Sequence, residues 1–148
     1  MIKYRKGDIT RHDFQDNDVI IHIVNDQGIM GSGLAYALYK KWPKVKERYL
    51  EIHNSTGLKL GHNHLIRTDG PSIFNMVAQT LGGDRPLCYI ALCECLKNVL
   101  EFLPKNSRIV TGKIGSMGAG GNWDFIKKCL HDAFIKNGHE VLIYEYKE

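Results

Sequence analysis

The strongest constraint on this chain is a unit that occurs twice: a β-branched run, a glycine-rich loop and a helical pattern. In the first unit, residues 19–24 precede a loop at residues 28–33. In the second, residues 109–114 precede a loop at residues 115–121. Glycines let the backbone adopt positive φ and approach a ligand closely, and backbone N–H groups at a helix start favour anions. Two such loops at the carboxyl ends of neighbouring strands predict a site that holds a diphosphate from both sides.

The rest of the chain alternates strand and helix patterns. Residues 18–24 form a nearly continuous apolar run, typical of a central strand covered on both faces. A turn at Asp69-Gly70-Pro71 separates two strand patterns and predicts a hairpin. Strands are expected at residues 2–5, 18–24, 64–68, 73–78, 108–114 and 141–146, and helices at 32–41, 44–53, 86–103 and 123–136. This order predicts one α/β domain over residues 1–148, a three-layer α/β/α fold with a mixed central sheet of about six strands.

Prolines, glycines and apolar spacing set the expected limits of the helices. Pro86 should open the third helix and Pro104 should stop it. Asn122 is a plausible N-cap of the last helix, and Gly138 a plausible glycine after its end. The third helix should bury the apolar residues that recur at helical spacing, namely Ile90, Cys93, Leu96, Leu100 and Leu103.

Composition bears on partners and location. The chain has 148 residues and a net charge of +4, without the strong basic stripe of a dedicated nucleic-acid binder, so no nucleic-acid partner is expected. Its four cysteines lack paired metal-ligand spacing and are expected to be reduced thiols. No apolar stretch approaches the roughly 20 residues needed to cross a bilayer. The sequence therefore predicts a cytoplasmic protein with no membrane partner, and it leaves the oligomeric state open.

Other phosphate-binding motifs fit poorly. A Walker loop requires Ser or Thr after Gly-Lys, whereas Ile114 follows Gly112-Lys113. A dinucleotide fingerprint requires an acidic residue at a strand end about 20 positions after its glycines, and here that position falls in a helix. Single glycine loops can also be simple turns, but two loops in equivalent places favour a ligand site.

The chain resembles the macrodomain family. The resemblance rests on Lys6-Gly7-Asp8-Ile9-Thr10, on IIHIVNDQGIMGSGLAYAL at residues 20–38 and on KIGSMGAGGNW at residues 113–123. It is greatest with the small stand-alone macrodomains of the ADP-ribose 1″-phosphate phosphatase type and with their phage and bacterial relatives. The family implies an ADP-ribose-type ligand and no cofactor.

The resemblance also implies residue roles. Asp8 would accept the adenine amino group, with the Ile9 backbone beside it. Asn25 and Asp26 would face the distal ribose, although Asn and Asp are also ordinary turn residues. The diphosphate and distal ribose would be lined by residues of the two loops: Gly31, Ser32, Gly33 and Leu34 in the first, and Gly115, Ser116, Met117, Gly118, Ala119, Gly120, Gly121 and Asn122 in the second.

Two departures from relatives affect the expected reaction. Related glycohydrolases use a lysine and an aspartate where this chain has Gln79 and Ala119, so that mechanism is not expected. Relatives with an aspartate before the tryptophan of the second loop have Asn122 here, and an amide cannot act as a base. Asp26 is therefore the best candidate acid or base.

The sequence supports one principal hypothesis and two alternatives. In the principal one, the protein is a metal-independent phosphomonoesterase that converts ADP-ribose 1″-phosphate to ADP-ribose and phosphate, with Asp26 and the adjacent Asn25 at the reacting end. The alternatives are an ADP-ribose binder without turnover and a hydrolase that removes ADP-ribose from macromolecules. His22, His62 and His64 do not supply enough ligands for a metal site.

Overall fold

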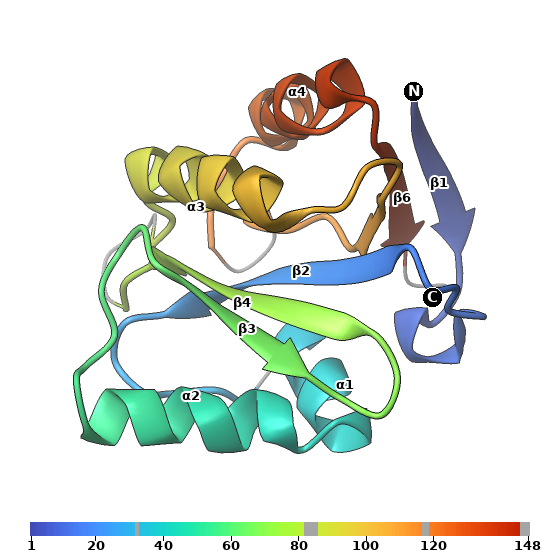
Figure 1. Cartoon of the computed structure of the whole chain (residues 1–148). Helices are drawn as coiled ribbons and strands as arrows, with labels where there is room; N and C mark the ends of the chain where they lie inside the picture. The colour runs from blue at the N-terminus through green and yellow to red at the C-terminus, as the bar shows by residue number, and fades with distance from the viewer. Residues whose placement is uncertain (32, 82–85, 117–118, 146–148) are drawn as a thin grey trace.

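A computed structural model describes residues 1–31, 33–81, 86–116 and 119–145 (Figure 1). Six strands, four α-helices and two short 3-10 turns alternate along these residues. In chain order the elements are β1 (Ile2–Lys6), η1 (Ile9–Arg11), β2 (Asp18–Asn25), α1 (Gly33–Lys41), α2 (Lys44–Asn54), β3 (Asn63–Arg67), β4 (Ser72–Gln79), α3 (Tyr89–Phe102), β5 (Arg108–Thr111), α4 (Trp123–Ala133), η2 (Ile135–Asn137) and β6 (Glu140–Glu145).

The six strands form one sheet in the order β1-β6-β5-β2-β4-β3. Neighbouring strands are parallel except β3, which pairs antiparallel with β4 as the expected hairpin. The mixed six-stranded sheet predicted from the sequence is therefore confirmed. Because β2 and β5 are parallel neighbours, the two glycine loops that follow them leave the sheet at the same edge.

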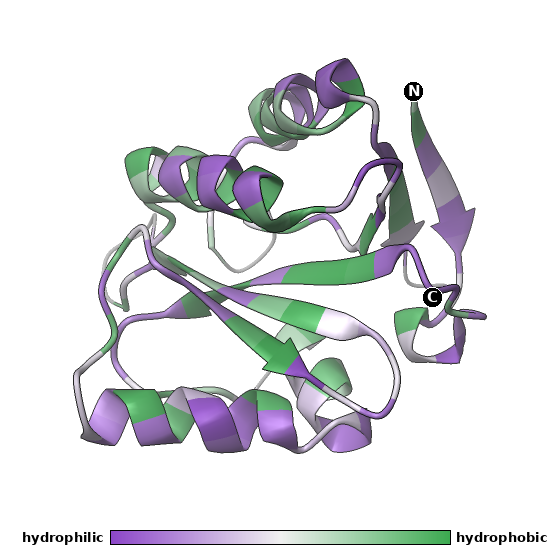
Figure 2. Cartoon of the chain, in the orientation of Figure 1, coloured by the Kyte–Doolittle hydropathy of each residue, from purple (hydrophilic) through white to green (hydrophobic). Residues whose placement is uncertain are grey.

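Helices cover both faces of the sheet, with α1 and α2 on one side and α3 and α4 on the other (Figure 1). Each face has its own apolar cluster. Ile20, Leu38 and Tyr49 are fully buried in the α1–α2 cluster, and Ile21, Leu92 and Ile126 in the α3–α4 cluster. Alternate residues of β2 thus serve opposite clusters, which explains its continuous apolar run (Figure 2). None of the described helices is both long enough and apolar enough to span a membrane.

The third helix differs from expectation in its start and its buried face. It begins at Tyr89 rather than Pro86, because Leu87 instead forms a β-bridge with Gln79 and Cys88 is the N-cap residue. Ile90 is 74% exposed and Cys93 is exposed. The helix buries Ala91, Leu92, Cys95, Leu96 and Val99. Its sequence is apolar over so much of its circumference that the spacing alone did not identify the face that contacts β4.

The ends of the second strand–loop–helix unit also differ in detail. β5 ends at Thr111, three residues before the predicted end, so the second loop is longer than expected. Asn122 does cap α4, since its side-chain oxygen accepts from the Phe125 N–H at 3.1 Å. Gly138 ends the following turn in the left-handed conformation, with φ of 84°. Both of these capping predictions are confirmed.

Candidate functional site

A cavity of about 640 Å³ opens at the carboxyl ends of the parallel strands, between the two glycine loops. It brings together residues that are far apart in the sequence. Seven of the predicted site residues line it: Ile9, Asn25, Gly31, Gly33, Leu34, Gly115 and Ala119. Six others, namely Asp8, Asp26, Ser116, Gly120, Gly121 and Asn122, are not among the lining residues. Ser32, Met117 and Gly118 lie outside the described residues.

Asp8 lies between two residues that line the cavity, Gly7 and Ile9. Its side chain caps η1, because one carboxylate oxygen accepts from the Thr10 N–H at 2.9 Å and from the Thr10 hydroxyl at 2.8 Å. This arrangement fixes the turn after β1 and leaves the Asp8 side chain exposed. A contact between Asp8 and a nucleobase stays a prediction.

Asn25 braces the first glycine loop from inside. Its amide donates to the Ile29 carbonyl at 2.5 Å, and its side-chain oxygen accepts from the Gln27 N–H at 3.0 Å. The Tyr49 hydroxyl from α2 lies 2.7 Å from that same oxygen and accepts from the Gly28 N–H at 3.1 Å. Burial raises the pKa of Tyr49 to about 12, so its hydroxyl stays protonated. Asn25 lines the cavity, but the hydrogen bonds of its side chain serve mainly to hold the first loop in place.

Asp26 follows the cavity residue Asn25 and has an unusual environment for a carboxylate. Its backbone N–H donates to the Gln79 carbonyl at 3.1 Å, which ties the loop to β4. Its Oδ1 atom is buried and has no hydrogen-bond partner among the described residues. A buried carboxylate oxygen without a partner is costly in a folded protein. Asp26 thus has an unused acceptor, and because Asp26 does not line the cavity, contact between this oxygen and a substrate or water stays a prediction.

The glycines of the first loop differ in their surroundings. A Cβ added at Gly31 or Gly33 would meet nothing within 4 Å, so both face open space at the cavity. A Cβ at Gly28 would lie 2.5 Å from His53 Cδ2, and Gly28 also has φ of +79°. Gly28 makes the turn, whereas Gly31 and Gly33 leave room beside the N-terminus of α1. The backbone N–H groups of that helix start can therefore meet an anion.

The second loop folds tightly on itself. The Gly121 N–H donates to the Gly115 carbonyl at 2.7 Å, and the Leu87 N–H donates to the Ala119 carbonyl at 3.1 Å. A Cβ at Gly121 would lie 2.3 Å from the Gly115 oxygen. Asn122 uses its side chain to cap α4, and its N–H donates to the Tyr89 hydroxyl at 2.8 Å. Gly115 and Ala119 are the described parts of this loop that line the cavity.

The sequence reasoning missed the cavity residues that follow β5 and end β6. Lys113, Tyr144 and Glu145 line the cavity, together with Gly7 and Gly112. The sequence predicts that the carboxyl ends of parallel strands share one edge of the sheet. It does not give the strand order, which places the ends of β6 and β1 beside the end of β5.

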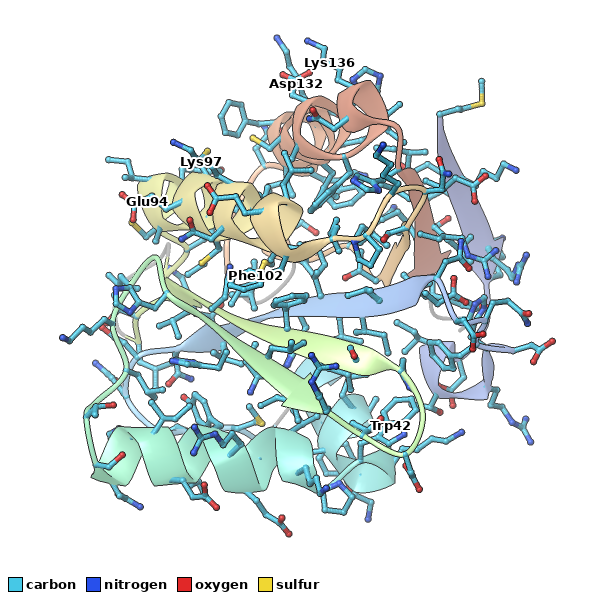
Figure 3. All side chains as sticks on the ribbon, in the orientation of Figure 1. Trp42, Glu94, Lys97, Phe102, Asp132 and Lys136 are labelled. Carbon is cyan, nitrogen blue, oxygen red and sulfur yellow. The ribbon has the colours of Figure 1, made fainter. Side chains whose placement is uncertain are left out.

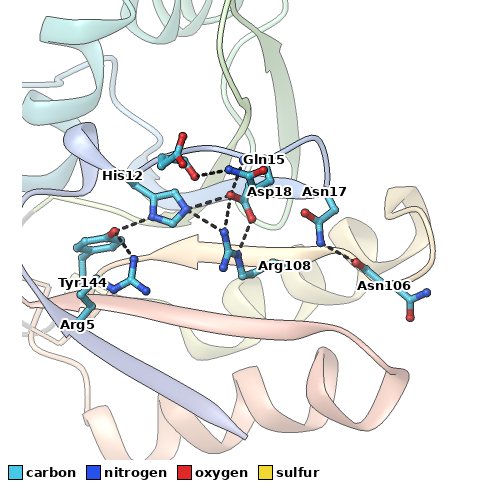
Figure 4. Close-up of polar contacts among 9 residues, drawn as sticks. Arg5, His12, Gln15, Asn17, Asp18, Asn106, Arg108 and Tyr144 are labelled. Carbon is cyan, nitrogen blue, oxygen red and sulfur yellow. Dashed lines mark hydrogen bonds and ion pairs between the residues drawn. The ribbon is translucent and has the colours of Figure 1, made fainter.

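Tyr144 is held in the cavity wall by a buried polar network (Figure 4). Its hydroxyl lies 2.6 Å from His12 Nδ1, and His12 Nε2 lies 3.0 Å from Asp18 Oδ2. Arg108 donates to both Asp18 oxygens, at 2.6 and 2.8 Å. Burial raises the pKa of Asp18, but hydrogen bonds from Arg108 and Gln15 outweigh it and hold that pKa below its usual value. The charged Asp18–Arg108 pair thus fixes His12, and His12 fixes the Tyr144 ring.

His22 lies in the core and does not line the cavity. His22 is fully buried in β2 and bonds Asn75 at 2.5 Å, and burial lowers its pKa to about 4. It is therefore a neutral core residue. Within the described ranges, no group of three or more His, Cys, Asp or Glu side chains could hold a metal ion.

The chain is similar in sequence and in structure to several known proteins. No family model matches the chain. It is 33% identical over 138 residues to an uncharacterised 17.5 kDa protein of Enterobacteria phage T4, covering 88% of each protein. It is 33% identical over 75 residues to an ADP-ribose 1″-phosphate phosphatase of Candida albicans, covering 49% of this chain and 48% of that protein. A macrodomain protein from Streptomyces coelicolor has a similar structure, with a TM-score of 0.84, 25% identity and coverage of 99% of this chain and 100% of that chain.

Proposed function

Because this chain belongs to the macrodomain family, we propose that its cavity binds an ADP-ribose-type nucleotide with the diphosphate between the two glycine loops. The observation that carries the proposal is the open space at Gly31 and Gly33 beside the start of α1. Backbone N–H groups there can donate to phosphate oxygens, and the positive end of the helix dipole favours the anion. The cavity volume of about 640 Å³ lies within the range of small-molecule sites.

Calorimetric titration with ADP-ribose tests the binding proposal. Gly31→Glu would introduce a carboxylate where the diphosphate is expected, into space that is open in the free protein. We expect the unfolding temperature to change little and the affinity to fall at least about tenfold, because two like charges would meet in a partly desolvated site. Gly31→Gln is the matched uncharged control. Equal affinity for wild type and Gly31→Glu would exclude this location for the diphosphate.

We further propose that the protein removes the terminal phosphate from ADP-ribose 1″-phosphate. A water would attack phosphorus, the bond between phosphorus and the 1″ oxygen would break, and ADP-ribose would leave with a proton on that oxygen. Asp26 would orient or deprotonate the water with its unpartnered carboxylate oxygen. The partial similarity to the Candida albicans phosphatase supports this choice of reaction.

Phosphate release by wild type and Asp26→Asn tests the reaction. Asn keeps the shape of the side chain but cannot accept a proton, so we expect turnover to fall at least about 100-fold. The free energy of unfolding should change little, because Asn keeps the size of the side chain and the buried Oδ1 makes no hydrogen bond that the substitution would break. Turnover that is equal in the two proteins would remove Asp26 from the mechanism.

A second candidate function is binding without turnover. It is favoured by the cavity positions of Gln79 and Ala119, which carry no ionisable group, and by the structural bonds that occupy Asn25 and Asn122. The phosphate-release assay distinguishes the two functions. Both require ADP-ribose binding, but a protein that only binds would release no more phosphate than Asp26→Asn does.

A further inference from the structure

Two oppositely charged side chains meet at the end of the cavity formed by β5, β6 and β1. Lys113 Nζ lies 3.0 Å from Glu145 Oε2. Both residues line the cavity, and their side chains are 39% and 33% exposed. They are the sole charged side chains among the described lining residues.

The backbone holds both residues firmly while the side chains stay accessible. The Lys113 carbonyl accepts from the Ser116 hydroxyl at 2.8 Å, which closes the start of the second glycine loop. The Glu145 carbonyl accepts from the Gly7 N–H at 2.8 Å, next to the end of β1. The ion pair therefore joins two fixed positions across the cavity edge.

An ion pair of this exposure contributes little to stability, since water screens it. Its lysine can therefore exchange its partner at small cost. A phosphate of a bound nucleotide can accept the same kind of charge-assisted hydrogen bond from the ammonium as the Glu145 carboxylate does. In contrast, the pair between Asp132 on α4 and Lys136 on η2, at 3.2 Å, points outward from the molecule (Figure 3), and neither residue lines the cavity.

We propose that Lys113 is an anion-binding residue of the cavity, and that Glu145 holds it in the free protein and releases it to a phosphate of the bound nucleotide. This inference rests on the proposed function, because it takes a phosphorylated nucleoside as the ligand. Glu145 opposes the ligand's negative charge and Lys113 favours it, so the pair sets how strongly the cavity selects for anionic ligands.

Single substitutions should therefore shift affinity in opposite directions. Glu145→Gln frees Lys113 and removes a repelling charge, so ADP-ribose should bind on the order of fivefold more tightly. Lys113→Gln leaves Glu145 unpaired, so ADP-ribose should bind on the order of fivefold more weakly. The double variant should fall between the two, and Lys136→Gln is the matched control that should match wild type.

Calorimetry with ADP-ribose, AMP and adenosine measures these shifts, with thermal unfolding as the check on folding. The opposite shifts should be present for both phosphorylated ligands, and adenosine, which is neutral, should show neither. Shifts of the same sign, no shifts, or equal shifts with adenosine would overturn the role of the pair while leaving the proposed function intact. Absence of ADP-ribose binding by wild type would overturn both proposals.

Discussion

The two glycine loops share a composition but use it differently. In the first loop, Gly31 and Gly33 face open space, so the missing side chains leave room at the cavity. In the second, Gly115 and Gly121 pack against each other, with 2.7 Å between the Gly121 nitrogen and the Gly115 oxygen. Gly31 and Gly33 of the first loop therefore leave space for a ligand while Gly28 makes its turn, whereas Gly115 and Gly121 of the second loop permit a tight turn. A glycine-rich sequence alone does not distinguish these roles.

The loops also differ in what supports them. Side chains brace the first loop, because Asn25 and the Tyr49 hydroxyl bond several of its backbone groups. Backbone hydrogen bonds support the described part of the second loop, apart from the Ser116 hydroxyl at its start and the contacts of Asn122 at its end. Truncation of Asn25 or Tyr49 should therefore disturb the first loop, and a Cβ added at Gly121 should disturb the second.

The largest expected effect is that of Gly121→Ala. The new Cβ would lie 2.3 Å from the Gly115 oxygen and 2.5 Å from Leu87 Cδ2, so the loop must shift. We expect the free energy of unfolding to fall by about 3 kcal/mol, measured by urea denaturation. Gly31→Ala is the control and should change it by less than about 0.5 kcal/mol. Equal losses of unfolding free energy in Gly121→Ala and Gly31→Ala would contradict the proposed difference between the loops.

A smaller effect is expected for Tyr49→Phe. The change removes the hydroxyl that lies 2.7 Å from Asn25 Oδ1 and accepts from Gly28. We expect a loss of about 1–2 kcal/mol in the free energy of unfolding. Hydrogen exchange should be faster at the Gly28 amide. Tyr39→Phe on α1 is the control, because its hydroxyl has no hydrogen bond within the described part of the chain. Unchanged exchange at Gly28 would show that the first loop does not depend on this brace.

The smallest effect is expected for Asn122→Ala. Loss of the cap on α4 should cost about 1 kcal/mol of unfolding free energy, whereas Asn122→Asp should retain the cap. ADP-ribose affinity, followed by calorimetry, should change less than about twofold in both variants if capping is the main role of this side chain. A much larger loss of affinity in Asn122→Ala would assign the amide to the ligand, as the family resemblance implies.

Much of the fold followed from the sequence, for identifiable reasons. The apolar run of β2 and the two loop-plus-helix units define the parallel core, and the turn at Asp69 to Pro71 defines the hairpin. The face of α3 did not follow, because that helix offers two apolar stripes and only packing on β4 selects between them. Residues such as Lys113 and Glu145 did not follow either, since their proximity depends on β6 lying between β1 and β5.

The central claim is that the nucleotide's diphosphate lies between the two loops. A crystal structure of the complex with ADP-ribose tests it most directly. We expect phosphate oxygens within hydrogen-bonding distance of backbone N–H groups at the start of α1, near Gly33 and Leu34, and the second loop on the opposite side of the diphosphate. A diphosphate bound away from Gly31 and Gly33, or a ligand outside this cavity, would contradict the account.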